Sequence, residues 1–205
     1  MATFLVRSIS QLQDLSASTK PLKDMIESRY WRAELRSELI WLRRNRRYSR
    51  WSEKKHVLFE RRLMLVAFQV RSLLERPKVN QTARGATCPA TRYKKIGNQP
   101  FTAIGSGWPH EMFDFSKPDA TYLPALTVCN QLIHYYWMQT YSNNRSFESI
   151  LVFSDYERHK WAYEIQIADL LKMLQVFADD SSALRSACFE WDEKKLDYVV
   201  RPAGT

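Results

Sequence analysis

We organise the predicted fold around the stretch Cys129-Asn130-Gln131-Leu132-Ile133-His134-Tyr135-Tyr136-Trp137. The apolar residues around its polar groups predict a helix that begins near Pro124 and runs to about Tyr141. On that helix Asn130 and His134 are four residues apart, so their side chains lie on one face, about one turn from each other. From there both side chains can act on a single group.

Two long helices are predicted before this stretch, and a short one is expected at residues 3–15. The first long helix starts near residue 22 and carries an apolar stripe made of Trp31, Leu35, Leu39 and Leu42. The second covers residues 52–75, with Ser52 as its N-cap, and Pro77 ends it. Its apolar stripe is broad enough for a central core helix and consists of Phe59, Leu63, Val66, Val70 and Leu73.

The remaining segments are predicted to be shorter and partly extended. Residues 78–121 are rich in proline and glycine, so we expect an irregular insertion in which short strands can form. Apolar and β-branched residues at 149–153 and 161–167 predict a hairpin, followed by a helix at 168–177. A second hairpin is predicted from 187–191 and 196–200, which flank a polar turn.

Together these elements predict a helix-dominated α+β fold in a single domain, residues 1–205. We divide it into a helical part at about 1–77, the irregular insertion at about 78–121, and the motif helix with the hairpins at about 122–205. Both hairpins therefore fall in the C-terminal half of the chain.

The composition points to an anionic partner. Lysine and arginine number 31 against 22 acidic residues, which gives a formal charge of +9. Nucleic acid is the first candidate, and an acidic protein or an anionic membrane follows.

Much of the excess positive charge lies in one basic cluster with Tyr48 and Trp51 interleaved: Arg43, Arg44, Arg46, Arg47, Arg50, Lys54 and Lys55. Guanidinium groups pair with phosphates and aromatic rings stack on bases, so we predict that this cluster binds nucleic acid. A solvated face or a surface for an acidic partner protein is the alternative.

Other kinds of site are not indicated. Cys88, Cys129 and Cys188 form no CxxC pair and are odd in number, which argues against a disulfide framework and a zinc site. The histidines show no metal-ligand spacing, and we predict no metal and no organic cofactor. No apolar run has the length of a signal peptide or a membrane span. We therefore expect a cytoplasmic protein without a membrane partner.

At Asn130 and His134 the sequence resembles the HEPN superfamily, small helical proteins of prokaryotic defence and toxin systems. The signature of that family is an arginine, a polar residue that is often asparagine, three further residues and a histidine. Asn130 and His134 occupy the last two signature positions, and Cys129 stands where the family has its arginine. The resemblance includes the helix-rich layout and implies a HEPN-like helical core to which the two hairpins are added. The stretch is also similar to uncharacterised prokaryotic proteins.

The resemblance implies metal-independent cleavage of RNA. His134 would move the proton of the attacking 2′-hydroxyl, and Asn130 would orient His134 or contact phosphate. The family's arginine would stabilise the developing negative charge, and loss of such a group costs on the order of 10²- to 10³-fold in rate. Arg158 or Lys160 could supply this charge from elsewhere in the fold. The resemblance further implies a homodimer in which the motif helices face each other.

These observations predict a HEPN-like protein that binds RNA or another nucleic acid in a prokaryotic antiviral defence or toxin–antitoxin system. The absent arginine leaves open whether it is also a ribonuclease. The alternative is a non-catalytic subunit of a larger complex, whose arginine cluster docks on an acidic partner protein. Asn130 and His134 would then be internal struts that hydrogen-bond the segment covering them.

Overall fold

The structure, a computed structural model, describes residues 24–47, 52–75, 79–102, 104, 107–143, 146–180, 187–194 and 196–202. Its helices are α1 (Asp24–Asn45), α2 (Glu53–Glu75), α3 (Gln81–Arg84), α4 (Pro109–Met112), α5 (Ala125–Ile133) and α6 (Ile167–Asp179). Its strands are β1 (Thr87–Lys94), β2 (Asp119–Pro124), β3 (Tyr135–Ser142), β4 (Phe147–Ser154), β5 (Trp161–Gln166), β6 (Ala187–Asp192) and β7 (Asp197–Pro202).

Five of these strands form one antiparallel sheet in the order β2-β1-β5-β4-β3. Near its middle, β4 pairs with β5, so that Ile150 lies opposite Ile165 and Leu151 opposite Glu164. The β4 residues at positions 150–153 are all fully buried. Such a continuous apolar run is typical of a strand that is covered on both faces. β6 and β7 pair with each other in a separate two-stranded sheet.

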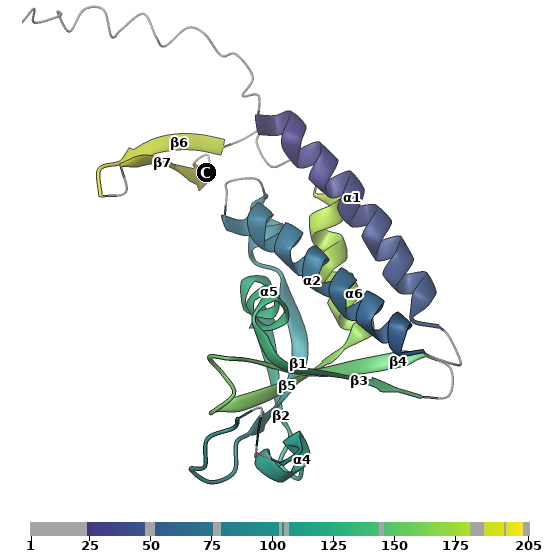
Figure 1. Cartoon of the computed structure of the whole chain (residues 1–205). Coiled ribbons are helices and arrows are strands. Elements are labelled where there is room, and N and C mark those ends of the chain that lie inside the picture. Colours follow the sequence, from purple (N-terminus) through teal and green to yellow (C-terminus); the bar gives the residue numbers. More distant parts are fainter. Residues whose placement is uncertain are drawn as a thin grey trace, which may run out of the picture.

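Helices cover one face of the five-stranded sheet (Figure 1). α5 and α6 pack on the strands, α2 packs on α5 and α6, and α1 packs on α2 and α6. The predicted stripe of α2 faces this core, and each of its members is at most 1% exposed: Phe59, Leu63, Val66, Val70 and Leu73. Burial of one such side chain contributes roughly 1.5–3 kcal/mol. α2 thus joins the other three long helices into one core.

The second face of the sheet is covered by the segment between β1 and β2, which includes α4. Phe101 and Phe113 of this segment pack on Phe153 of β4, with ring centroids 5.1 and 5.0 Å apart. β1 and the first residues of β2 lie within the segment 78–121, as the predicted short strands allowed. The irregular middle of this segment therefore forms the cover of a second, aromatic core.

The predicted length of the motif helix is wrong. α5 ends at Ile133, and His134 is its C-cap, with φ −109° and ψ 31°. The residues from Tyr135 onward, which we expected in the same helix, form the edge strand β3 beside β4. Aromatic and β-branched side chains favour a strand, and pairing with β4 satisfies the backbone groups of this stretch. Tertiary pairing thus prevails over the helical pattern.

The other helices and strands predicted within the described residues agree with the structure. α1 and α2 are the two long helices, α6 contains residues 168–177, and β4–β5 and β6–β7 are the two hairpins. The expected helix at 3–15 lies outside the described residues. The α+β class is confirmed, whereas a HEPN-like helical core is not. The first hairpin was expected as an addition to helices, but it lies in the interior of the five-stranded sheet.

A buried ion pair joins α1 to the end of α6. Arg32 is 8% exposed and Asp180 is 5% exposed, and the guanidinium Nη2 lies 3.5 Å from the carboxylate Oδ2. Burial lowers the pKa of the Arg32 guanidinium from its ordinary value. The same carboxylate oxygen accepts a hydrogen bond of 2.9 Å from the backbone N–H of Asn80. Asp180 therefore links α1, α6 and the turn before α3.

We predict that Asp180→Ala lowers the free energy of unfolding by about 3–5 kcal/mol, because it leaves the buried Arg32 guanidinium without this carboxylate. The neighbouring Asp179→Ala is the matched control, since that side chain is 61% exposed and lies 3.8 Å from Arg36. Its effect should stay within about 0.5 kcal/mol. Urea denaturation followed by circular dichroism measures both, and equal effects of the two variants would contradict the structural role of Asp180.

Candidate functional site

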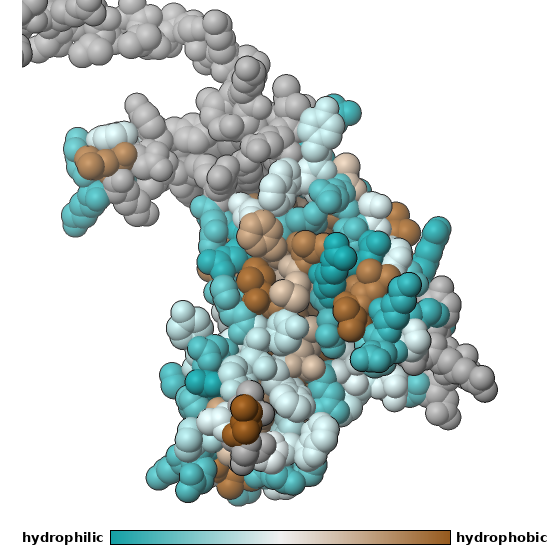
Figure 2. Space-filling view, viewed as in Figure 1, coloured by the Kyte–Doolittle hydropathy of each residue, from teal (hydrophilic) through white to brown (hydrophobic). Residues whose placement is uncertain are grey.

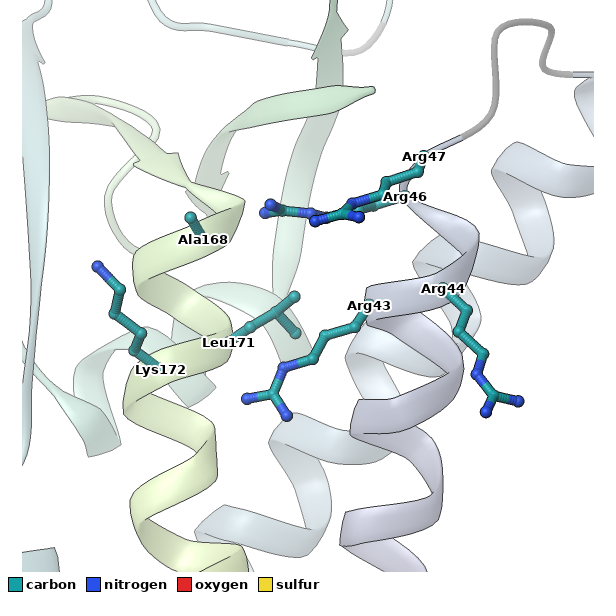
Figure 3. Close-up of a pocket in the computed structure, with 7 residues that line it drawn as sticks. All are labelled: Arg43, Arg44, Arg46, Arg47, Ala168, Leu171 and Lys172. Carbon is teal, nitrogen blue, oxygen red and sulfur yellow. The ribbon is translucent and has the colours of Figure 1, made fainter. Parts of the chain in front are cut away.

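Four of the predicted arginines line one groove. Arg43 and Arg44 lie in the last turn of α1, and Arg46 and Arg47 follow directly. The groove has a volume of about 620 Å³, and its opposite wall is formed by Ala168, Leu171 and Lys172 of α6. Figure 3 shows the side chains of Arg43, Arg46 and Arg47 extending toward α6, whereas Arg44 points away from it. We call this feature the arginine groove.

Core packing holds the two walls together. Leu39 and Leu42 on the buried stripe of α1 belong to the same core cluster as Leu170 and Leu174 of α6. Beyond the end of α1, the carbonyl of Arg46 accepts a hydrogen bond of 2.9 Å from the N–H of Phe147, the first residue of β4. The backbone that carries the arginines is therefore fixed to the sheet, whereas the guanidinium groups of Arg43, Arg46 and Arg47 extend into the groove (Figure 3).

The groove is strongly positive. No carboxylate lines it, and within the described residues none of its four arginines has an ion-pair partner. Lys172 is the exception among the cations, because its Nζ lies 2.9 Å from Asp169 Oδ1. The N-cap of α6, Gln166, makes no side-chain capping hydrogen bond, so that the first N–H groups of this helix add a partial positive charge beside Ala168.

Not all of the predicted basic cluster is part of the groove. Arg50, Tyr48 and Trp51 lie outside the described residues. Lys54 and Lys55 lie in the first turn of α2 and do not line the groove. The α6 wall could not be predicted from the sequence, since Lys172 is an isolated lysine on an amphipathic helix.

The structure brings an arginine to His134 that the sequence did not indicate. Nη1 of Arg71, on α2, lies 3.0 Å from Nε2 of His134. An arginine can only donate, so Nε2 is the acceptor in this hydrogen bond. Nε of Arg71 also donates to Glu75 at 2.6 Å. His134 is exposed, and Arg71 is 30% exposed, so this arginine–histidine pair is open to solvent.

The two candidate cations from the turn after β4 do not contact His134 in the described structure. Arg158 lies 4.3 Å from the ring centroid of Tyr136, and its Nε lies 3.2 Å from Asp155. Lys160 is an exposed residue whose carbonyl accepts a hydrogen bond from Lys95. Arg71 is therefore the cation that the fold places beside the imidazole.

Asn130 and Cys129 have different environments from His134. The Oδ1 atom of Asn130 is buried and has no hydrogen-bond partner within the described residues. Cys129 is fully buried, and this burial raises the pKa of its thiol to about 12, which keeps it protonated and unreactive near neutral pH. The backbone N–H of His134 donates to the carbonyl of Asn130, but no described contact joins the two side chains.

The arginine groove and the arginine–histidine pair lie at opposite ends of α2. Phe147, which hydrogen-bonds the carbonyl of Arg46, packs against His56 in the first turns of α2, with ring centroids 5.1 Å apart. At 1.5 Å per residue, His56 and Arg71 are about 22 Å apart along the helix. The fold therefore keeps the two predicted parts of the site separate within one chain.

Neither a metal site nor a membrane span is found in the described ranges. They contain no group of three or more histidine, cysteine, aspartate or glutamate residues that could hold a metal ion. No described helix is both long and apolar enough to cross a bilayer.

Comparison with known protein families, with curated proteins and with solved structures gives no match.

We predict that His134→Ala changes the free energy of unfolding by less than about 1 kcal/mol, because an exposed hydrogen bond contributes little net stability. Gln131→Ala, one turn earlier on α5, is the comparison: this side chain is 4% exposed, and its Oε1 accepts the N–H of Ser154 at 2.7 Å. Its loss should cost about 1–3 kcal/mol. Thermal melts of both variants measure the difference. A larger loss of stability for His134→Ala than for Gln131→Ala would indicate that His134 is an internal strut.

Proposed function

We propose that this protein binds the phosphate backbone of single-stranded RNA in the arginine groove. The observation that supports this most is that four arginines without described ion-pair partners line a groove whose described lining contains no carboxylate. Guanidinium groups bind phosphate oxygens in a bidentate manner and stay charged at every physiological pH. A cluster of this kind costs stability by mutual repulsion, and a bound anion relieves that repulsion.

The shape of the groove favours a flexible single strand. The arginines extend from one wall, and the opposite wall supplies Leu171 and the start of α6. A single strand can bend its backbone into such a concave site and turn its bases outward, whereas a rigid duplex meets only the rim. The first N–H groups of α6 can donate to a phosphate in the same position.

The setting in prokaryotic defence or a toxin–antitoxin system stays a prediction from the HEPN resemblance.

Binding should be strongly dependent on salt. If each of the three arginines that extend toward α6 neutralises one phosphate, a fourfold rise in salt weakens binding of single-stranded RNA by about 20-fold. The variant Arg43→Gln/Arg46→Gln/Arg47→Gln should reduce the log–log slope by about 2. Fluorescence anisotropy of a labelled RNA oligonucleotide at several salt concentrations measures both quantities.

The matched control removes three exposed lysines outside the groove, Lys94→Gln/Lys117→Gln/Lys160→Gln, and lowers the net charge by the same amount. It should leave the salt slope nearly unchanged. Equal losses in the two triple variants would show attraction by net charge alone. An absence of RNA binding in the unmodified protein would refute the proposal and favour the alternative, an acidic partner protein docked on the arginines.

A second candidate function is RNA cleavage at the arginine–histidine pair. The specific observation is the 3.0 Å contact between Arg71 and His134, because it supplies the positive charge that the sequence motif lacks. His134 has an accepting Nε2 that can take the proton of a 2′-hydroxyl once that hydroxyl replaces the guanidinium as its partner. The 2′-oxygen would then bond to phosphorus while Arg71 stabilises the negative charge that develops on the phosphorus oxygens. The bond from phosphorus to the 5′-oxygen would break, and the 5′-oxygen would take the proton back from His134, which leaves a 2′,3′-cyclic phosphate and a 5′-hydroxyl.

We predict for this candidate that single-stranded RNA is cleaved in the presence of EDTA and that His134→Ala abolishes the cleavage. Arg71→Ala should reduce the rate on the order of 10²- to 10³-fold, as for other charge stabilisers. Arg158→Ala is the control, since its guanidinium contacts Tyr136 and not His134. Denaturing gels resolve the products, and intact RNA after incubation with the unmodified protein would exclude the ribonuclease while leaving the binding proposal in place.

A further inference from the structure

The outer face of α2 is apolar although nothing described covers it. Val57 is 59% exposed, Leu65 is 47% exposed and Phe68 is 54% exposed. These side chains lie on the side of α2 opposite the buried stripe, so the helix carries apolar residues on both sides. Figure 2 shows hydrophobic side chains on the surface along α2, interrupted by hydrophilic ones. A helix that is apolar on both sides is normally buried on both sides.

The order of residues along this face is self-complementary. With the helix spacing of three and four, the outward positions are Lys54, Val57, Arg61, Met64, Leu65, Phe68, Ser72 and Glu75. The middle of this series is apolar, one end carries a positive charge, and the other end carries a negative charge. We infer that the outer face of α2 binds the same face of a second copy of this chain, with the two helices antiparallel and the two-fold axis at Met64 and Leu65.

The antiparallel arrangement gives each outward residue a suitable partner. Met64 lies opposite Leu65 of the second copy, and Phe68 lies opposite Arg61, whose guanidinium can stack on the ring. Such contacts occur twice, because a two-fold interface uses the same patch on both chains. A crossing of about 20° is the common geometry for long helices that pack side by side. It keeps the 23 residues of α2 within reach of the partner helix.

Charge complementarity selects the antiparallel orientation. Lys54 at the start of one α2 lies opposite Glu75 at the end of the other, whereas a parallel arrangement would place like charges together. Glu75 already accepts a hydrogen bond from Arg71 within its own chain, and its side chain remains 51% exposed. Lys54 is exposed and has no ion pair within the described residues. Val57 then lies opposite the small side chain of Ser72.

This interface rests on α2 alone and does not depend on the RNA-binding proposal. It differs from the homodimer that the HEPN resemblance implies, because that dimer would pair the helices bearing Asn130 and His134. In the antiparallel pair, the N-terminal end of each α2 lies beside the C-terminal end of the other. The arginine groove of one copy and the arginine–histidine pair of the other are then found at the same end of the dimer.

Sedimentation of the full chain over a range of concentrations tests the inference. The unmodified protein should form a dimer, and Phe68→Glu should raise its dissociation constant at least about 100-fold, as expected for a central aromatic contact. Ile40→Glu on α1 is the matched control: Ile40 is 49% exposed and lies outside the interface, so dimerisation should not change. A monomer at all concentrations, or a dimer unaffected by Phe68→Glu, would overturn the inference.

A charge exchange separates loss of the interface from loss of folding. Lys54→Glu and Glu75→Lys should each weaken the dimer several-fold, because each places like charges at both ends of the helix pair. The double variant should restore dimerisation, since the opposite charges meet again with their positions exchanged. Weakening in the double variant that equals the sum of the two single effects would contradict the antiparallel register.

Discussion

α2 packs against α1, α5 and α6 and so holds the helical layer together. Its buried stripe from Phe59 to Leu73 contacts the core that α1, α5 and α6 share, and α5 and α6 in turn cover the sheet. Because α2 is one continuous helix of 23 residues, it fixes the distance between the features at its two ends. The arginine groove lies near its start, and the pair of Arg71 and His134 lies near its end.

The sequence predicted those parts of the fold that follow from local periodicity. The stripes of α1 and α2 repeat at three and four residues, so both helices could be located. The end of α5 could not be located, because the apolar pattern of the residues after His134 is compatible with a helix and with a strand. Their pairing with β4 is a long-range interaction that the pattern does not encode. The same holds for the cover of the second sheet face, where Phe101 and Phe113 pack on Phe153.

The two basic sites could also be predicted only where their residues are close together in the sequence. Arg43, Arg44, Arg46 and Arg47 were predictable as a cluster because they are adjacent in the chain, but the wall opposite them comes from α6. Arg71 is separated from His134 by 63 positions, and only the packing of α5 on α2 brings them together. A motif search along the chain looks for the arginine next to Asn130 and finds Cys129, which is a buried core thiol. In our proposal the arginine groove binds phosphate, whereas the arginine–histidine pair places an imidazole beside a guanidinium. RNA binding and RNA cleavage can therefore be tested separately.

Hydrogen exchange of the backbone amides, measured with and without a single-stranded RNA oligonucleotide, shows whether RNA binds in the arginine groove. We expect bound RNA to slow exchange in the first turn of α6, from Ile167 to about Leu170, and around Arg46 and Arg47. The N–H groups at the start of α6 receive no side-chain cap from Gln166, and they lie where we expect the phosphates to bind. Slower exchange confined to other parts of the surface, with the start of α6 unchanged, would contradict the arginine groove as the RNA-binding site.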